Sequence, residues 1–178
     1  ERVVYTSTYS KPFSTGIRVG FGLAPEFLWE AMNHLKANHD FGTPSLNQAV
    51  MRRVLETGLF DEYLETLRAR YAHKAGLMGA ALEAHGAGQL RYEIPEGGLY
   101  YWAQAPESIE TSMGSPFFQA VFDRDTLYVP GELCYAEDPW RPRPTNGMRL
   151  SFGGAPDDRI AEGIRRLVGA LDTVSAAR

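Results

Sequence analysis

The residues best suited to chemistry lie near the start of the chain, where Lys11 follows two hydroxyl residues. Thr8 and Ser10 come just before Lys11, and Arg18 follows in the glycine-punctuated stretch GIRVG. Hydroxyl groups and a guanidinium donate hydrogen bonds to phosphate oxygens, and a guanidinium can donate two in parallel. A lysine acts as a nucleophile or base only when its amine is unprotonated, which a nearby cation favours. The pattern therefore indicates an anion pocket beside a reactive lysine.

A second arginine, Arg149, lies near the C-terminus in GMRLSF, where apolar residues alternate with polar ones. Such alternation is typical of a strand with one buried face. A planar, permanently charged guanidinium suits a carboxylate, which it can bind through two parallel hydrogen bonds. Taken alone, each feature has an ordinary alternative. Lys11 and Arg18 can belong to a surface turn and an ion-paired strand, and Arg149 can be a solvated arginine on a sheet.

Hydrophobic periodicity predicts the elements that position these residues. Residues 3–5 read as a short buried strand, and residues 17–23 alternate as a second strand that contains Arg18. A helix is predicted from Pro25 to the stretch NHDFGTP, and a long one from about Asp61 to His85. Between them, Thr43 is predicted to cap a helix that ends near Thr57.

The later part of the chain is predicted to contain more strands. QLRYEIPEGGLYYWAQAP reads as two strands with a tight connection, followed by a short helix over about residues 115–123. TLYVPGELCY and GMRLSF read as further strands, the first ended by its Pro-Gly pair. A last helix is predicted to start near Pro156, with acidic residues in its first turn. Its buried stripe is predicted to be Ile160, Ile164, Leu167, Val168 and Leu171.

The composition is that of an ordinary globular protein, with 44% hydrophobic and 22% charged residues among 178. The net charge of -4 gives no basic surplus, so we expect no direct nucleic-acid contact from this segment. No apolar run reaches the roughly 20 residues that span a bilayer. The single cysteine, Cys134, is typical of a reducing cytoplasm and is interpreted as a small core residue. No Cys or His spacing indicates a metal site.

Four segments together resemble the fold-type-I pyridoxal-phosphate (PLP) aminotransferases. The Ser-Lys pair with GIRVG resembles their active-site lysine signature, and RLSF resembles their carboxylate-binding strand. PEGGLYYW and the turn in YVPGE resemble two further family segments, and all four occur in the family's order. The match looks closest to the branch that includes 2-aminoadipate and aromatic aminotransferases and the effector domains of MocR-type transcription regulators.

The resemblance implies a role for each candidate residue. Lys11 is expected to form a Schiff base with the cofactor aldehyde and to move protons, while Thr8, Ser10 and Arg18 hold the cofactor phosphate. Arg149 is expected to bind the substrate α-carboxylate. The implied activity transfers an amino group between an amino acid and a 2-oxo acid, without a metal, in a cytoplasmic homodimer.

The implied fold is α/β, PLP-transferase fold type I. Residues 1–42 are predicted to be the incomplete end of the large PLP-binding domain, and residues 43–178 the C-terminal small domain with the long linking helix. The family's phosphate turn, stacking aromatic ring, and cofactor-binding Asn, Tyr and Asp precede the lysine and have no counterpart here. We therefore expect a C-terminal portion of a longer polypeptide, inactive without its N-terminal remainder, with exposed strand edges around residues 3–8.

Two other functions are open on the sequence alone. The chain can be the PLP-binding effector domain of a MocR-type regulator, which a basic helix-turn-helix upstream of it would indicate. It can also be a non-catalytic fragment, which failure to bind PLP would favour. The segments specify neither the amino donor nor the reaction type, because decarboxylases and lyases share this scaffold.

Overall fold

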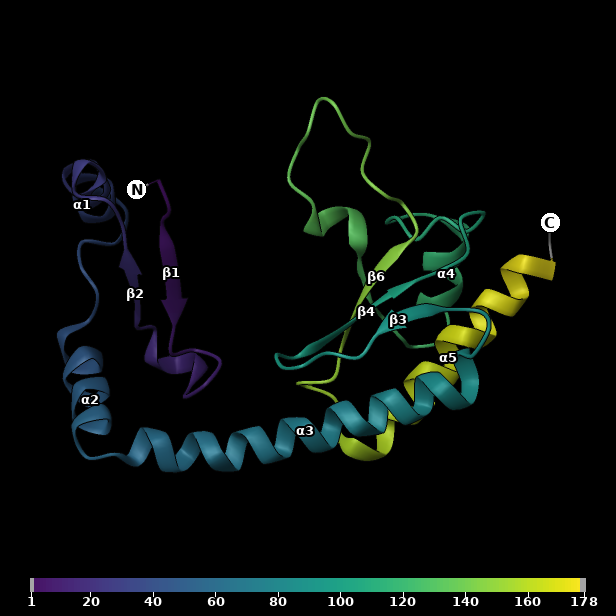
Figure 1. The fold of residues 1–178 in the computed structure, drawn as a ribbon, viewed down its shortest axis with the longest axis horizontal. Coiled ribbons are helices and arrows are strands. Elements are labelled where there is room, and N and C mark those ends of the chain that lie inside the picture. The colour runs from purple at the N-terminus through teal and green to yellow at the C-terminus, as the bar shows by residue number, and fades with distance from the viewer. Residues whose placement is uncertain (1, 177–178) are drawn as a thin grey trace. The chain divides into compact units, whose positions relative to one another are not determined.

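The computed structural model describes residues 2–176, and the chain divides into two compact units between Ala69 and Arg70 (Figure 1). The first unit contains β1 (Tyr5–Thr8), β2 (Gly20–Leu23), α1 (Glu26–Asp40), α2 (Ser45–Glu56) and the start of α3 (Leu59–Gly86). The second contains the rest of α3, β3 (Arg91–Glu93), β4 (Tyr100–Gln104), α4 (Pro116–Phe122), β5 (Val129–Pro130), β6 (Gly147–Ser151) and α5 (Asp157–Ala176). The mixed α/β character agrees with the prediction.

In the first unit, β1 and β2 form a two-stranded antiparallel sheet. The register places Thr8 opposite Gly20, where a Cβ would lie 2.6 Å from the carbonyl oxygen of Ser7. Glycine is therefore required for the two strands to approach this closely. Among residues 2–176, β1 pairs with no other strand, so its outer edge is unpaired, as expected.

Both strand predictions in this unit were partly wrong. The strand predicted at residues 3–5 lies at Tyr5–Thr8, and Val3 and Val4 are 75% and 45% exposed because the described residues do not cover them. The second strand starts at Gly20 and not at residue 17, because a 3-10 turn, Thr15–Ile17, leads into Arg18 with a left-handed φ of 50°. The sequence pattern missed this because one residue with a left-handed backbone does not change the alternation of apolar residues.

The helices of the first unit lie close to the predicted ranges. Pro44 and not Thr43 occupies the N-cap of α2, and no side chain caps that helix end. Helix α1 buries none of its apolar side chains within the described residues, although its amphipathic pattern predicted a buried side. The small core of this unit includes Ile17 and Met51, and the Asn47 amide on α2 donates to the Ile17 carbonyl at 2.9 Å.

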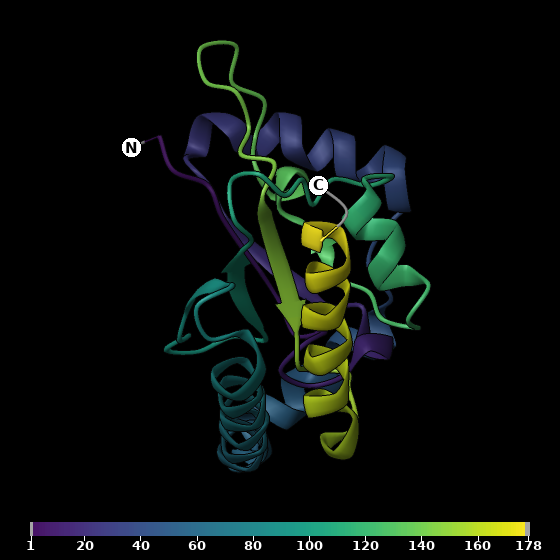
Figure 2. The ribbon, with the colours of Figure 1, turned by 90° about the vertical axis from the view of Figure 1, so that its right-hand side faces the viewer.

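The second unit is built on an antiparallel sheet with strand order β3-β4-β6-β5. Strand residues alternate as predicted, so Tyr101, Ala103, Met148 and Leu150 share one buried face. The later part of α3 and helices α4 and α5 cover that face, and Figure 2 shows α5 (yellow) from its side, next to the strands. The predicted buried stripe of α5 is confirmed.

The Val-Pro-Gly turn after β5 brings two backbone segments together. A Cβ on Gly131 would lie 2.7 Å from the carbonyl group of Gly147, so only glycine permits this approach. The turn continues as a 3-10 helix, Gly131–Cys134, which leads into an exposed loop. Cys134 is therefore exposed, and its interpretation as a core residue was wrong.

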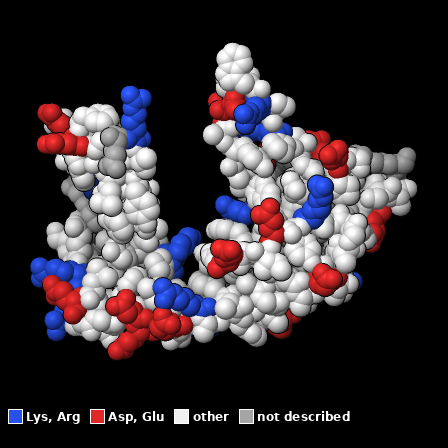
Figure 3. Space-filling model, in the orientation of Figure 1, with Lys and Arg blue, Asp and Glu red and all other residues white. Residues whose placement is uncertain are grey.

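The surface charges are mixed in sign. Figure 3 shows basic side chains interspersed with acidic ones on the visible face of each unit. Among residues 2–176, no helix is long and apolar enough to cross a bilayer. The domain division at residues 42 and 43 and the cytoplasmic location stay predictions.

Candidate active site

The first unit brings three of the predicted site residues together at the end of β1. The Thr8 hydroxyl donates to the Ser10 hydroxyl at 3.0 Å and accepts a bond from the Ser10 backbone N–H at 3.1 Å. The Arg18 guanidinium donates to the Ser10 hydroxyl at 3.4 Å and to the Thr15 carbonyl at 3.5 Å. Thr8, Ser10 and Arg18 thus form one polar cluster, although seven residues separate Ser10 from Arg18 in the sequence.

The left-handed conformation of Arg18 makes this cluster possible. In the predicted regular strand, the Arg18 side chain would project from one face of the sheet, because successive side chains of a strand alternate between the two faces. The 3-10 turn and the left-handed residue redirect the chain instead, and the Arg18 side chain reaches back to Ser10. A left-handed backbone costs a non-glycine residue roughly 1–2 kcal/mol, and such strain is typical of functional sites.

Lys11 lies in the tight turn that follows Ser10. The Tyr9 carbonyl accepts bonds from the backbone N–H groups of Phe13 and Ser14 at 3.0 and 3.1 Å, which close the turn around Lys11. Two aromatic contacts, Tyr9 with Phe60 and Phe13 with Tyr63, attach the turn to the start of α3. The Lys11 side chain is exposed, whereas the backbone of its turn is fixed by these hydrogen bonds and aromatic contacts.

The donors in this cluster fit a phosphate group. No acidic residue occurs between Arg2 and Pro25, and among residues 2–176 no carboxylate pairs with Arg18. A phosphate needs several hydrogen-bond donors and at least one cation, and two hydroxyls with a guanidinium supply both. The chemistry of the residues therefore suits the phosphate of PLP.

The remaining predicted residue, Arg149, belongs to the second unit. It lies in the middle of β6, opposite Trp102 of β4 and Val129 of β5, on the sheet face that the helices leave uncovered. Its Nε is buried without a hydrogen-bond partner, and no carboxylate of residues 2–176 lies within 4.0 Å of its guanidinium. A buried donor without a partner is rare in a folded protein, so the position of Arg149 calls for an explanation such as a bound ligand.

Two aromatic residues beside Arg149 were not identified from the sequence. The guanidinium carbon of Arg149 lies 4.3 Å from the centroid of the Tyr100 ring. The Trp102 ring packs over Gly147, where a Cβ would lie 2.8 Å from it, and meets Tyr135 edge-on. The alternation in LYYWAQ, which places Tyr100 and Trp102 on one face and Tyr101 on the other, was the available signal.

A groove of about 410 Å³ in the second unit does not belong to this site. Its walls include Leu150, Ile160 and Ile164, which lie on the helix-covered side of the sheet. Since adjacent residues of a strand point to opposite faces, Leu150 faces away from the side of the sheet that carries Arg149. This groove is therefore not part of the candidate active site.

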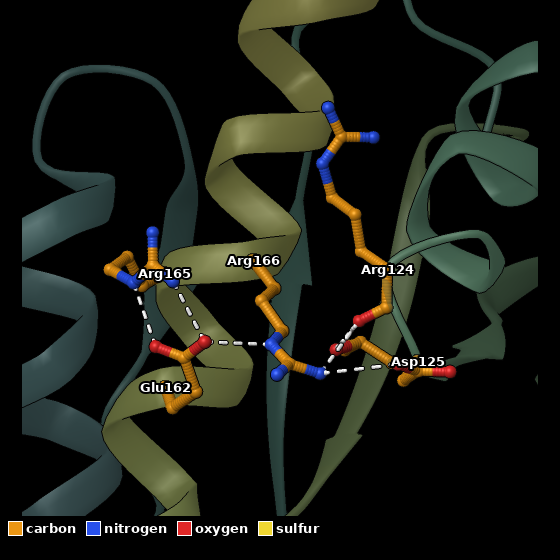
Figure 4. Close-up of polar contacts among 6 residues, drawn as sticks. Arg124, Asp125, Glu162, Arg165 and Arg166 are labelled. Carbon is orange, nitrogen blue, oxygen red and sulfur yellow. Dashed lines mark hydrogen bonds and ion pairs between the residues drawn. The ribbon is translucent and has the colours of Figure 1, made fainter.

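A second charged cluster fastens α5 to the segment after α4 (Figure 4). Glu162 accepts two hydrogen bonds from Arg165 and one from Arg166, each 2.7 Å long. Arg166 also donates to the Arg124 carbonyl at 2.9 Å, and Arg124 donates to the Ala120 carbonyl at 2.8 Å. Because the hydrogen bonds of the Glu162 carboxylate are satisfied within the protein, this is a structural cluster.

This cluster predicts a pH dependence of stability. Hydrogen bonds first from Arg165 and then from Arg166 lower the pKa of Glu162 from 4.5 to about 2. Because the folded-state pKa is the lower one, the stabilisation is full above pH 4.5 and is lost as the pH falls towards about 2. We expect Glu162→Gln to lower the thermal midpoint of the chain at about pH 6 and to have little effect near pH 2.

The measurement is a series of thermal melts between about pH 2 and pH 6. Glu107→Gln is the matched control, because within residues 2–176 Glu107 takes part in no ion pair. A difference between wild type and Glu162→Gln that stays constant across this range would contradict the assignment.

Comparisons with known proteins now identify the family. The family model described as aminotransferase class I and II matches residues 1–167. The chain belongs to this family. The 2-aminoadipate transaminase of Thermus thermophilus is 32% identical to this chain over 169 residues, which are 95% of the chain and 41% of the relative. The predicted family is therefore confirmed.

A solved structure extends the likeness to the fold. The crystal structure of alpha-aminoadipate aminotransferase from Thermus thermophilus, complexed with N-(5'-phosphopyridoxyl)-L-leucine, matches with a TM-score of 0.85 and 31% identity. The match covers 98% of this chain and 43% of that protein. The predicted PLP-transferase fold type I is confirmed.

A transcriptional regulator is also similar to the chain. TauR, an HTH-type transcriptional regulator of Rhodobacter capsulatus, is 30% identical over 170 residues, which are 96% of this chain and 34% of TauR. The chain thus spans well under half the length of each of these relatives.

Proposed function

We propose that the protein containing this chain is a PLP-dependent aminotransferase that moves an amino group between an amino acid and a 2-oxo acid. The observation that carries the proposal is the convergence of Thr8, Ser10 and Arg18 beside the Lys11 turn. Membership of the aminotransferase family supports it.

Each candidate residue has a role that its chemistry allows. Thr8, Ser10 and Arg18 bind the phosphate and so fix the position of the cofactor relative to Lys11. Lys11 would hold the cofactor, and its free amine would act as the base that moves a proton away from the substrate α-carbon during the transfer of the amino group. PLP, when bound, acts as an electron sink that stabilises the negative charge developing on that carbon. Arg149 orients the substrate by binding its α-carboxylate.

The proposal includes parts that lie outside this chain. We infer an N-terminal remainder that supplies the ring-stacking and ring-nitrogen contacts, because residues 2–176 offer only the phosphate-binding and carboxylate-binding groups described above. We also infer a homodimer. The unpaired edge of β1 and the exposed apolar residues of α1 support a larger assembly.

A PLP-binding effector domain is the second candidate. The 30% identity to TauR over 96% of the chain supports it. In such a protein the same residues would hold the cofactor, and the bound state would be transmitted to a DNA-binding domain. Turnover distinguishes the two candidates, because an enzyme converts amino acids catalytically whereas an effector domain needs only to bind the ligand.

The decisive experiment is borohydride reduction in the presence of PLP, followed by peptide mass mapping. It is run on the longest natural polypeptide and on this chain, whose lysines are Lys11, Lys36 and Lys74. We expect a phosphopyridoxyl adduct on Lys11. Turnover is then assayed with 2-aminoadipate, phenylalanine, kynurenine and leucine as donors.

The outcomes separate the alternatives. An adduct on Lys11 with turnover supports the enzyme, and an adduct without turnover on any donor supports the effector domain. An adduct only in the longer form means that this chain is an incomplete piece of the site. The absence of an adduct in both forms would favour a non-catalytic fragment and overturn the proposal.

A further inference from the structure

Arg149 lies on the face of the second sheet that the helices leave uncovered, and one of its buried hydrogen-bond donors has no partner within the described residues. Arg149 lies at the centre of this face, half-buried, with a buried Nε that has no partner among residues 2–176. An unsatisfied buried donor costs stability, since it has lost its hydrogen bonds to water. The residues around it must therefore hold the guanidinium in place by something other than an ion pair.

Tyr100 provides that contact. The register pairs Tyr100 with Ser151 and Trp102 with Arg149, so the Tyr100 ring is the diagonal neighbour of Arg149 on the same face. The guanidinium carbon lies 4.3 Å from the ring centroid, well within the distance at which a ring quadrupole attracts a cation. The ring therefore holds the cation without neutralising it.

The difference between a ring and a carboxylate matters for a binding site. A carboxylate partner would occupy the fork of guanidinium N–H groups that a ligand needs. A ring attracts the cation through its face and accepts no N–H bonds in the plane of that fork, so the donors stay free for a ligand. Trp102, directly opposite Arg149, limits the space on the same face.

We propose that Tyr100 is a positioning residue, whose ring face holds Arg149 in place so that its guanidinium selects a substrate α-carboxylate. The inference rests on the proposed function and adds to it the residue that orients Arg149. If Tyr100 has this role, loss of its ring weakens binding of the substrate α-carboxylate and leaves binding of the rest of the amino donor unchanged.

The test compares two donors that differ only at the carboxylate. It uses the longest natural polypeptide with PLP, the best amino acid from the donor panel, and the α-amide of that amino acid. The measured quantity is the ratio of kcat/KM for the acid to kcat/KM for the amide, from single-turnover kinetics. We expect Tyr100→Leu to lower this ratio about five- to tenfold, mainly through KM for the acid.

Conservative and graded variants separate positioning from folding. Tyr100→Phe keeps the ring and should restore most of the lost ratio, and replacing Tyr100 by a trifluorinated phenylalanine should lower it again because fluorine weakens the ring quadrupole. Tyr92→Leu, on the helix-covered face of the same sheet, is the matched control and should not change the ratio. If Tyr100→Leu does not fold, the fluorinated variant still tests the proposal.

Two results would overturn the inference in distinguishable ways. If Arg149→Gln lowers the ratio but the Tyr100 variants all keep it, Tyr100 has no positioning role and the proposed function stands. If Arg149→Gln also keeps the ratio, the carboxylate assignment itself is wrong, and both proposals lose their basis at this site.

Discussion

Lys11→Ala is expected to lower transamination by at least about a thousandfold, because it removes both the cofactor attachment and the group that moves the substrate proton. The tight turn holding Lys11 is closed by backbone bonds to Tyr9, so the fold should tolerate the change. The measurement is turnover of the longest natural polypeptide with the best donor and a 2-oxo acid, together with a thermal melt. The melting temperature should be nearly unchanged.

Lys36→Ala provides the matched control in the same unit. Its amine forms an exposed ion pair with Asp40 at 2.7 Å, a kind of contact that contributes little to stability. Its removal should change turnover by less than about twofold. Turnover of Lys11→Ala close to that of wild type would refute the assignment of Lys11 as the catalytic lysine, whatever the cofactor content of the variant.

Arg149→Gln is expected to reduce kcat/KM for the amino donor roughly a hundredfold, mostly through a higher KM. The variant removes the only cation proposed to face the substrate carboxylate, and a neutral amide donates weaker hydrogen bonds. Arg149→Lys should recover a part of the loss, because an ammonium supplies the charge but not the planar fork. The measurement is half-reaction kinetics across a range of donor concentrations.

Arg91→Gln tests whether the effect is specific to the position. Arg91 is an exposed arginine on β3 of the same sheet, and it takes part in no ion pair of residues 2–176. We expect its kinetics to match wild type. An equal loss in Arg91→Gln and Arg149→Gln would point to a general effect of surface charge and would remove the case for a carboxylate site.

Local sequence patterns were sufficient for most elements of the second unit. The alternation in GMRLSF placed Met148 and Leu150 in the core, and the stripe from Ile160 to Leu171 identified the buried side of α5. These predictions succeeded because the period of a strand or helix is a local property, and because one side of each element is buried against the same core. The family's segments, in their order, likewise indicated which residues to examine.

The same patterns failed in the first unit for a physical reason. An apolar stripe is buried only where another part of the protein covers it. The described residues leave Val3, Val4 and, on α1, Phe27, Trp29 and Leu35 exposed. The predicted strand through Arg18 was wrong because a single left-handed residue breaks no hydrophobic period.

Residue types and order therefore determined the family, the candidate lysine and the two candidate arginines. Only the tertiary structure decided which atoms meet: that Arg18 turns back to Ser10, and that Arg149 meets the ring of Tyr100 and keeps a buried Nε without a partner. Such contacts depend on backbone conformation at one residue and on register between strands. Periodicity identifies which face of a strand is buried, but it shows neither a single left-handed residue nor which residues of two distant strands lie side by side.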